Sequence, residues 1–202
     1  MVSSVRTIFT TLFCFLLSAS YASAQSPVGA ATGKTINVGL GYSYVSHGDG
    51  LSHPVGLNGA NASFTIGYSR LALKADVGYA RAANVHGTGR HSDVLSYLVG
   101  PVYHPKPNRH FDPYLQVLVG AARVTGPAPL KGGGFLLGGW MTYYAWAMGG
   151  GVDYWISSSL AIRTGADYMR TAYFDPALAI RGRNNLRTTA TIVYYFGRPN
   201  RK

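Results

Sequence analysis

Three consecutive residues, His91, Ser92 and Asp93, are of the types that form the catalytic set of a serine hydrolase. In such a set the acid orients the histidine, and the histidine takes the proton of the serine nucleophile. Adjacent residues of a strand point to opposite faces, so His91 and Ser92 could cooperate only if the chain bends between them. The chain also contains no glutamate that could replace the acid. The sequence therefore predicts that the protein is not an enzyme.

Metal and phosphate chemistry have equally weak support in this sequence. The histidines lack the tight spacing of metal ligands, and no cysteine or glutamate lies near them. The glycine runs 132–134 and 149–151 are not followed by the lysine and hydroxyl residue of a phosphate-binding loop. We therefore expect no metal and no cofactor. The six histidines are His47, His53, His86, His91, His104 and His110.

The first 24 residues have the features of a secretory signal. Arg6 precedes an apolar run from Ile8 to Leu17, and small residues then lead to an Ala-Ser-Ala site that ends at Ala24. The run is shorter than the roughly 20 residues of a membrane-spanning helix, which is the alternative. The sole cysteine, Cys14, lies inside this segment. We therefore predict a cleaved signal peptide over 1–24 and a mature domain over 25–202.

The mature segment alternates apolar and polar residues with a period of two, which is typical of β-strands. In the segment 35–45, for example, Ile36, Val38 and Leu40 alternate with Asn37 and Gly39. No stretch after the signal approaches 18 apolar residues, so membrane-spanning helices are not expected. Eight strands are predicted over 35–45, 60–68, 71–80, 94–103, 113–122, 143–155, 160–169 and 186–196.

The connections between these strands alternate in length. Long connections are expected at 46–59, 81–93, 123–142 and 170–185, and short ones at 69–70, 104–109 and 156–159. This order is typical of an up-and-down barrel with long loops outside the cell and short turns in the periplasm. The sequence therefore predicts an all-β fold, an eight-stranded antiparallel transmembrane β-barrel.

Three cationic and three acidic residues fall on the face opposite the apolar residues, which would be the lumen. A narrow barrel is filled by such side chains, and buried charges need partners, so we expect a paired structural network. The same charges could instead line a narrow conducting path, and an error of one residue in register would turn them outward. The six residues are Lys74, Asp76, Asp153, Arg163, Asp167 and Arg187.

The formal net charge of +11 is then carried mainly at the two ends of the barrel. An excess of positive residues in the long loops suits the phosphates of lipopolysaccharide, although a merely solvated rim is an alternative. Nucleic-acid binding is not expected, because the positive residues form no single basic helix or stripe. The expected rim residues are Arg81, Arg90, Arg123, Lys131, Arg170, Arg181 and Arg183, with the acids Asp49, Asp93 and Asp175.

The segments YLVGPVY, PYLQVLVGAARV, WAMGGGVDYW and IRTGADYM resemble the bacterial outer-membrane β-barrel domain family of the small OmpA/OmpX-like type. The resemblance covers nearly the whole mature chain and implies the fold and an outer-membrane location more than any activity. The last strand also resembles the signal that the barrel-assembly machinery reads. Thr191 stands where that signal usually has glycine. The positions are Thr189, Thr191, Tyr194 and Phe196.

The sequence thus predicts a monomeric structural and surface-interaction protein of the outer membrane. It would display four loops, contact outer-membrane lipid and lipopolysaccharide, and contribute to envelope integrity or adhesion. The alternatives are a soluble lipocalin-like ligand-binding barrel, a narrow pore and a lipid A deacylase-like membrane hydrolase.

Overall fold

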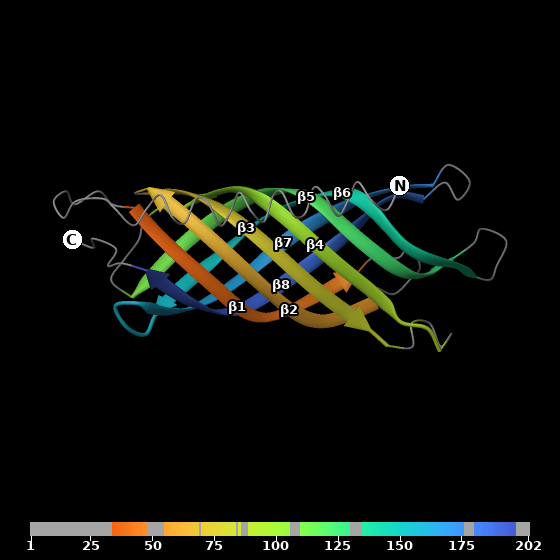
Figure 1. Ribbon diagram of the computed structural model, residues 1–202, viewed down its shortest axis with the longest axis horizontal. Coiled ribbons are helices and arrows are strands. Elements are labelled where there is room, and N and C mark those ends of the chain that lie inside the picture. The colour runs from red at the N-terminus through yellow and green to blue at the C-terminus, as the bar shows by residue number, and fades with distance from the viewer. Residues whose placement is uncertain are drawn as a thin grey trace, which may run out of the picture. The chain divides into compact units, whose positions relative to one another are not determined.

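Over the part of the chain that it describes, a computed structural model shows eight strands and almost no helix (Figure 1). Among the residues that it describes, no helix is long and apolar enough to cross a membrane. The strands are β1 Lys34–His47, β2 Val55–Tyr68, β3 Leu71–Ala82, β4 Ser92–Tyr103, β5 Phe111–Pro129, β6 Phe135–Trp155, β7 Leu160–Asp175 and β8 Ile180–Phe196. The described residues are 34–47, 55–68, 70–83, 85, 89–105, 110–129, 135–175 and 180–196.

Several sequence predictions lie outside the described residues. They include the signal peptide over 1–24, the tips of the expected long loops, and the rim residues Asp49 and Lys131. Of the residues 172–175 and 180–183 only the backbone is described, so the predicted rim side chains of Asp175, Arg181 and Arg183 also lie outside the described part.

Each strand pairs antiparallel with its neighbours in the sequence, and β8 pairs with β1, which closes the sheet into a barrel. The closing register runs from Ile36 opposite Phe196 to His47 opposite Asn185. Every backbone group along this seam therefore has a hydrogen-bonding partner strand, as a membrane-spanning sheet requires. The predicted eight-stranded up-and-down barrel is confirmed.

The two ends of the barrel differ. The end at which β1 begins and β8 ends also holds the connections after β2, β4 and β6, and we call it the turn end (Figure 1). The opposite end holds the connections after β1, β3, β5 and β7, and we call it the loop end. In Figure 1 the turn end is on the left and the loop end on the right.

The outer face of the barrel is apolar. Leu40 on β1, Leu71 on β3, Leu115 on β5 and Ile192 on β8 are about 60% exposed, at 64%, 61%, 59% and 61%. A protein in water rarely exposes large apolar side chains around its whole circumference, so we infer that this outer face contacts lipid. The predicted outward faces are confirmed on every strand, including β4, whose pattern is the least regular.

The strands extend further toward the loop end than the alternation of apolar residues predicts. Strands β5 and β6 contain 19 and 21 residues, so the expected long loop over 123–142 is largely strand. The expected loop over 170–185 is likewise mostly strand. Backbone hydrogen bonds hold these extensions, and outside the lipid no apolar alternation is needed to form them. Gly126, with φ of 143°, lies where the register of β5 and β6 shifts.

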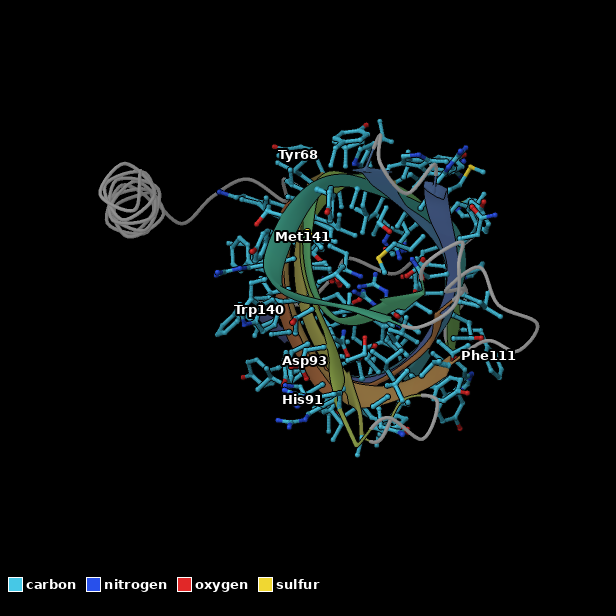
Figure 2. All side chains as sticks on the ribbon, turned by 90° about the vertical axis from the view of Figure 1, so that its right-hand side faces the viewer. Tyr68, His91, Asp93, Phe111, Trp140 and Met141 are labelled. Carbon is cyan, nitrogen blue, oxygen red and sulfur yellow. The ribbon has the colours of Figure 1, made fainter. Side chains whose placement is uncertain are left out.

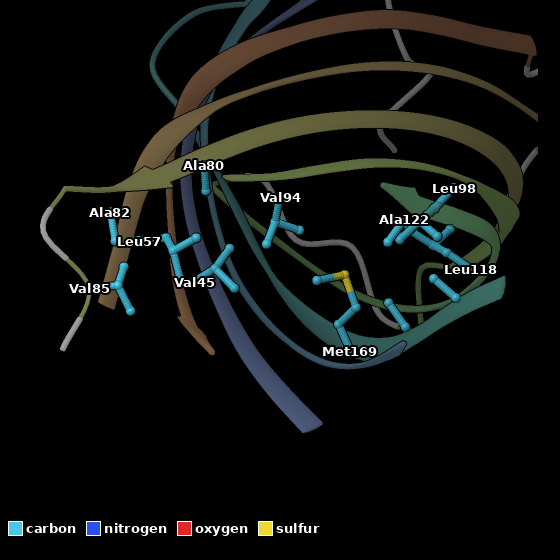
Figure 3. Packing of buried hydrophobic residues seen from close by; sticks show 12 residues of the cluster. Val45, Leu57, Ala80, Ala82, Val85, Val94, Leu98, Leu118, Ala122 and Met169 are labelled. Atoms are coloured by element: carbon cyan, nitrogen blue, oxygen red, sulfur yellow. The ribbon is translucent and has the colours of Figure 1, made fainter. Parts of the chain in front are cut away.

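The interior is layered. An apolar cluster lies mainly toward the loop end, where Val45, Leu57, Ala80 and Val94 pack with residues of the other strands (Figure 3). A second, smaller cluster contains Trp155 and Tyr195, whose ring centroids are 4.3 Å apart, at the turn end. The charged side chains occupy the space between. The sequence predictions for the interior centred on the charged network and did not include an apolar cluster.

Candidate functional site

The six charged residues that the sequence places in the lumen all lie inside the barrel, and each is at most 4% exposed. They come from β3, β6, β7 and β8, and inward neighbours on either side in sequence are mostly small or polar. Their formal charges sum to zero, three positive against three negative. The structure divides them into two groups, one of four residues and one of two.

The first group spans the lumen. The Arg187 guanidinium on β8 contacts Asp76 on β3 at 2.5 Å and Asp167 on β7 at 2.8 Å. Lys74 lies 3.2 Å from the other carboxylate oxygen of Asp76. Since β3 and β8 are not neighbours in the sheet, these contacts cross the interior. Arg187 thus joins opposite walls of the barrel.

Gln116 on β5 completes this group. Its Oε1 accepts a hydrogen bond from Lys74 at 3.1 Å, and its Nε2 donates to Asp167 at 2.6 Å. The side chains of Lys74, Asp76, Arg187, Asp167 and Gln116 therefore form a closed ring of polar contacts, which we call the lumen ring. The predicted charged network did not include Gln116, because a neutral side chain gives no charge to match.

The second group lies nearer the turn end. Arg163 on β7 forms a bidentate ion pair with Asp153 on β6. Its Nε donates to Oδ1 at 2.6 Å, and its Nη2 donates to Oδ2 at 2.8 Å. The Tyr195 hydroxyl donates to the same carboxylate at 2.5 Å, and the Arg163 guanidinium lies 5.1 Å from the Tyr114 ring centroid. The pair is thus hydrogen-bonded on several sides, which offsets the cost of removing both charges from water.

The hydrolase candidates are not assembled into a catalytic set. His91 Nε2 lies 3.2 Å from Asp93 on the outer wall. Ser92 faces the other way, and its hydroxyl donates to the Thr125 carbonyl at 2.9 Å. The structure brings His91 and Asp93 together but leaves Ser92 on the opposite face of the strand, as the alternation within β4 requires.

A polar cluster surrounds Asp93 at the loop end of the outer wall. The carboxylate accepts a hydrogen bond from the Tyr79 hydroxyl at 3.0 Å, and Arg81 Nε lies 3.5 Å away. On the next strands, Arg123 stacks over Trp140 with 5.2 Å to the ring centroid. Figure 2, viewed from the loop end, shows His91, Asp93 and Trp140 along the same side of the wall.

The expected assembly-signal residues lie on both faces of β8. Tyr194 and Phe196 point outward, 50% and 53% exposed, with ring centroids 5.0 Å apart. Thr191 is buried, and its hydroxyl donates to Asn61 Oδ1 at 3.3 Å. Thr189 also lies on the inner face, half-buried. The two aromatic residues are thus available to lipid and the two threonines are not.

Comparison of the chain with protein-family models gives no match, and comparison with curated proteins gives none either. Solved structures do resemble it. Neisserial surface protein A is 15% identical with a TM-score of 0.58, over 83% of this chain and 100% of that one. OprG from Pseudomonas aeruginosa is 14% identical with a TM-score of 0.52, over 83% and 98%. Ail of Yersinia pestis, in complex with sucrose octasulfate, is 13% identical with a TM-score of 0.50, over 81% and 99%.

At such low identities these similarities concern the fold. The similar proteins are outer-membrane β-barrels with eight strands, and the matches span almost the whole of each of them. The present chain shares their closed antiparallel topology and has the apolar outer face that a bilayer requires. The chain is therefore an eight-stranded β-barrel of the bacterial outer-membrane type.

Proposed function

We propose that the protein is a structural and surface-interaction protein of the outer membrane, of the small OmpA/OmpX-like kind, with a closed interior. In this role the barrel presents its loop end to the cell exterior and supports the integrity of the surrounding envelope. The observation that carries the proposal is the lumen ring, because its buried polar contacts cross the interior between β3, β5, β7 and β8.

The size of the barrel supports a closed interior. Eight strands enclose only enough space for side chains, whereas water-filled channels are built from roughly 16 or more strands. Here the lumen ring lies between an apolar cluster toward the loop end and the Trp155–Tyr195 pair at the turn end. An ion would have to break several buried contacts to pass all three layers.

A role at the cell surface is supported by the shape of the strands and by the similar proteins. Strands β5 and β6 continue well past the lipid-facing part, so the loop end carries ordered structure as well as loops. Among the similar proteins, one is named a surface protein and another an attachment invasion locus protein. Those names concern these proteins themselves, and they favour surface contact over catalysis as the role to test first.

Planar bilayer recordings test the closed interior. The purified protein should give no discrete conductance steps, whereas a trimeric porin recorded under the same conditions gives large ones. Discrete steps from the wild-type protein that change with Arg187→Met would contradict the proposal. They would establish instead the narrow pore as the function of the lumen.

Cells that lack the protein test the envelope role. We expect them to take up more of a hydrophobic fluorescent dye than wild-type cells, and expression of the full chain should restore the barrier. Unchanged dye uptake in the deletion strain would contradict a contribution to envelope integrity. Expression of the Ser92→Ala variant should restore the barrier as well as the wild type, because the Ser92 hydroxyl bonds the Thr125 carbonyl and does not contact His91 or Asp93.

A further inference from the structure

Five side chains on the outer wall at the loop end take no part in closing the lumen. They lie on β3, directly before and at the start of β4, and on β5 and β6, and they point away from the barrel axis. We call this group the rim cluster. Its members are Arg81, His91, Asp93, Arg123 and Trp140.

Asp93 organises one half of the rim cluster. Its side chain is only 6% exposed, because Tyr79, Arg81 and His91 cover the carboxylate. On the outer wall, it is the single carboxylate among the side chains that the structure describes. An approaching anion therefore meets little uncompensated negative charge. Arg81 contacts Asp93 through Nε and remains 52% exposed, so the end of its guanidinium stays accessible.

Arg123 and Trp140 form the other half. The indole is 42% exposed, and the guanidinium lies against it at 5.2 Å from the ring centroid. Stacking on an aromatic ring fixes the plane of an arginine while leaving its N–H groups at the edge free to bind an anion. Arg81 pairs with Asp93 on β4, and Arg123 pairs with Leu95 two residues further along β4. Their backbones are therefore about 12 Å apart, at ~4.8 Å per strand and ~3.3 Å per residue.

The position of the rim cluster relative to lipid points to its ligand. Tyr79, Tyr144 and Trp146 belong to the outward aromatic residues that mark the membrane boundary at the loop end. Arg81 lies two residues beyond Tyr79, or about 7 Å further along the strand. The arginines thus point sideways at the level of the lipid headgroups.

We propose that the rim cluster binds the phosphate groups of a phosphorylated glycolipid of the outer leaflet, the lipid A part of lipopolysaccharide. Arginine suits this ligand because its planar fork donates two parallel hydrogen bonds to a phosphate. Two arginines on either side of β4 can engage two phosphates of one headgroup, and Trp140 holds the Arg123 guanidinium in place by stacking. The proposal rests on the outer-membrane placement of the proposed function and names the partner through which the barrel supports the envelope.

A soluble polyanion fits the geometry less well. A large sulfated glycan approaches a barrel from above, where the loops are, whereas the rim cluster faces the side. The neighbouring outward residues toward the turn end, such as Leu95 and Tyr144, are apolar or aromatic, as contact with acyl chains requires. The arginines on the side of the barrel match the charged headgroup of a lipid, and the apolar residues next to them toward the turn end match its acyl chains.

The binding experiment uses the full barrel in detergent micelles. Bisphosphorylated lipid A, dephosphorylated lipid A and heparin are each titrated into the wild type, the R81Q/R123Q variant and the R70Q variant, and bound lipid is measured by native mass spectrometry. Arg70 is exposed in the turn between β2 and β3 at the opposite end, so R70Q is a matched control for loss of charge. A heat-dependent gel shift checks that each variant is folded.

We expect R81Q/R123Q to bind bisphosphorylated lipid A more weakly, by about tenfold for each arginine, and R70Q to bind like the wild type. Dephosphorylated lipid A should bind all three proteins as weakly as bisphosphorylated lipid A binds R81Q/R123Q. Equal binding by the wild type and R81Q/R123Q would overturn the proposal, as would an equal loss in R70Q. Tight heparin binding that depends on Arg81 and Arg123, without lipid A binding, would also overturn it.

The two proposals fail in different ways. If the deletion strain keeps its barrier while the purified protein still binds lipid A through the rim cluster, the envelope role is wrong and the lipid site stands. If the deletion strain is permeable but R81Q/R123Q binds lipid A normally, the envelope role stands and the lipid site is wrong.

Discussion

Arg187 and Asp76 meet across the barrel interior, 2.5 Å apart, although 111 residues and several strands separate them. Arg187 also holds Asp167 through Nε at 3.2 Å and Nη2 at 2.8 Å. One guanidinium therefore neutralises carboxylates from two walls. All three side chains are at most 2% exposed, so water cannot replace a missing partner.

Removal of Arg187 should destabilise the barrel strongly. Arg187→Met leaves Asp167 with Gln116 alone, and breaking a buried ion pair in this way costs about 3–5 kcal/mol. The double variant R187M/D167N should recover part of the loss, because no carboxylate is then left unpaired beside Gln116. Urea unfolding of the protein refolded in lipid vesicles measures both. A double variant that is less stable than R187M would show that the two side chains do not act as a pair.

The second group should respond to smaller changes in a graded way. Tyr195→Phe removes one hydroxyl that donates to Asp153 but keeps the ring against Trp155, so we expect a loss of about 1–3 kcal/mol. Arg163→Met leaves Asp153 without its cation and should cost more. The same urea titration compares them. If Y195F proves as harmful as R163M, the Tyr195 hydroxyl contributes as much to this layer as the Arg163 cation, which would contradict the graded response.

The closed barrel should survive in detergent until it is heated. We expect the unboiled protein to migrate differently from the boiled protein on a denaturing gel, because a closed hydrogen-bonded sheet resists detergent at room temperature. Absence of a shift, together with solubility in the absence of detergent, would contradict the membrane barrel and favour the soluble lipocalin-like alternative.

The last strand offers a test of the proposed assembly signal. Phe196→Ala should slow assembly by the barrel-assembly machinery in reconstituted membranes. Ile192→Ala is the matched control, because Ile192 also faces lipid on β8, at 61% exposed, and lies outside the proposed signal. In vesicles without the machinery the two variants should fold at similar rates. Equal behaviour of F196A and I192A with the machinery present would contradict a role for Phe196 in recognition.

The alternation of apolar residues was sufficient to predict the number of strands, their order and their faces. Leu40, Leu71 and Ile192 are outward because the lipid imposes a period of two on each spanning segment. Beyond the lipid that constraint ends, so the continuation of β5 to Pro129 left no trace in the pattern.

The contacts across the lumen could not be predicted from the sequence, for a different reason. The pattern assigns Lys74, Asp153 and Arg187 to the inner face, but it does not say which wall each meets. Whether Arg187 joins Asp76 or Asp153 depends on the stagger between strands, which is set by the closed barrel as a whole. Gln116 carries no charge, so its bridging contacts to Lys74 and Asp167 could not be predicted from the charge pattern.

The lumen ring also bears on how the barrel reaches its correct alignment. If one strand slides by two residues against its neighbour, every apolar side chain still faces lipid, so the hydrophobic pattern cannot oppose that error. Such a slip of β8 would move Asn185 or Thr189 into the place of Arg187, so that Asp167 would lose its cation and Asp76 would keep only Lys74. Ion pairing across the interior thereby penalises misaligned barrels that the membrane alone would accept.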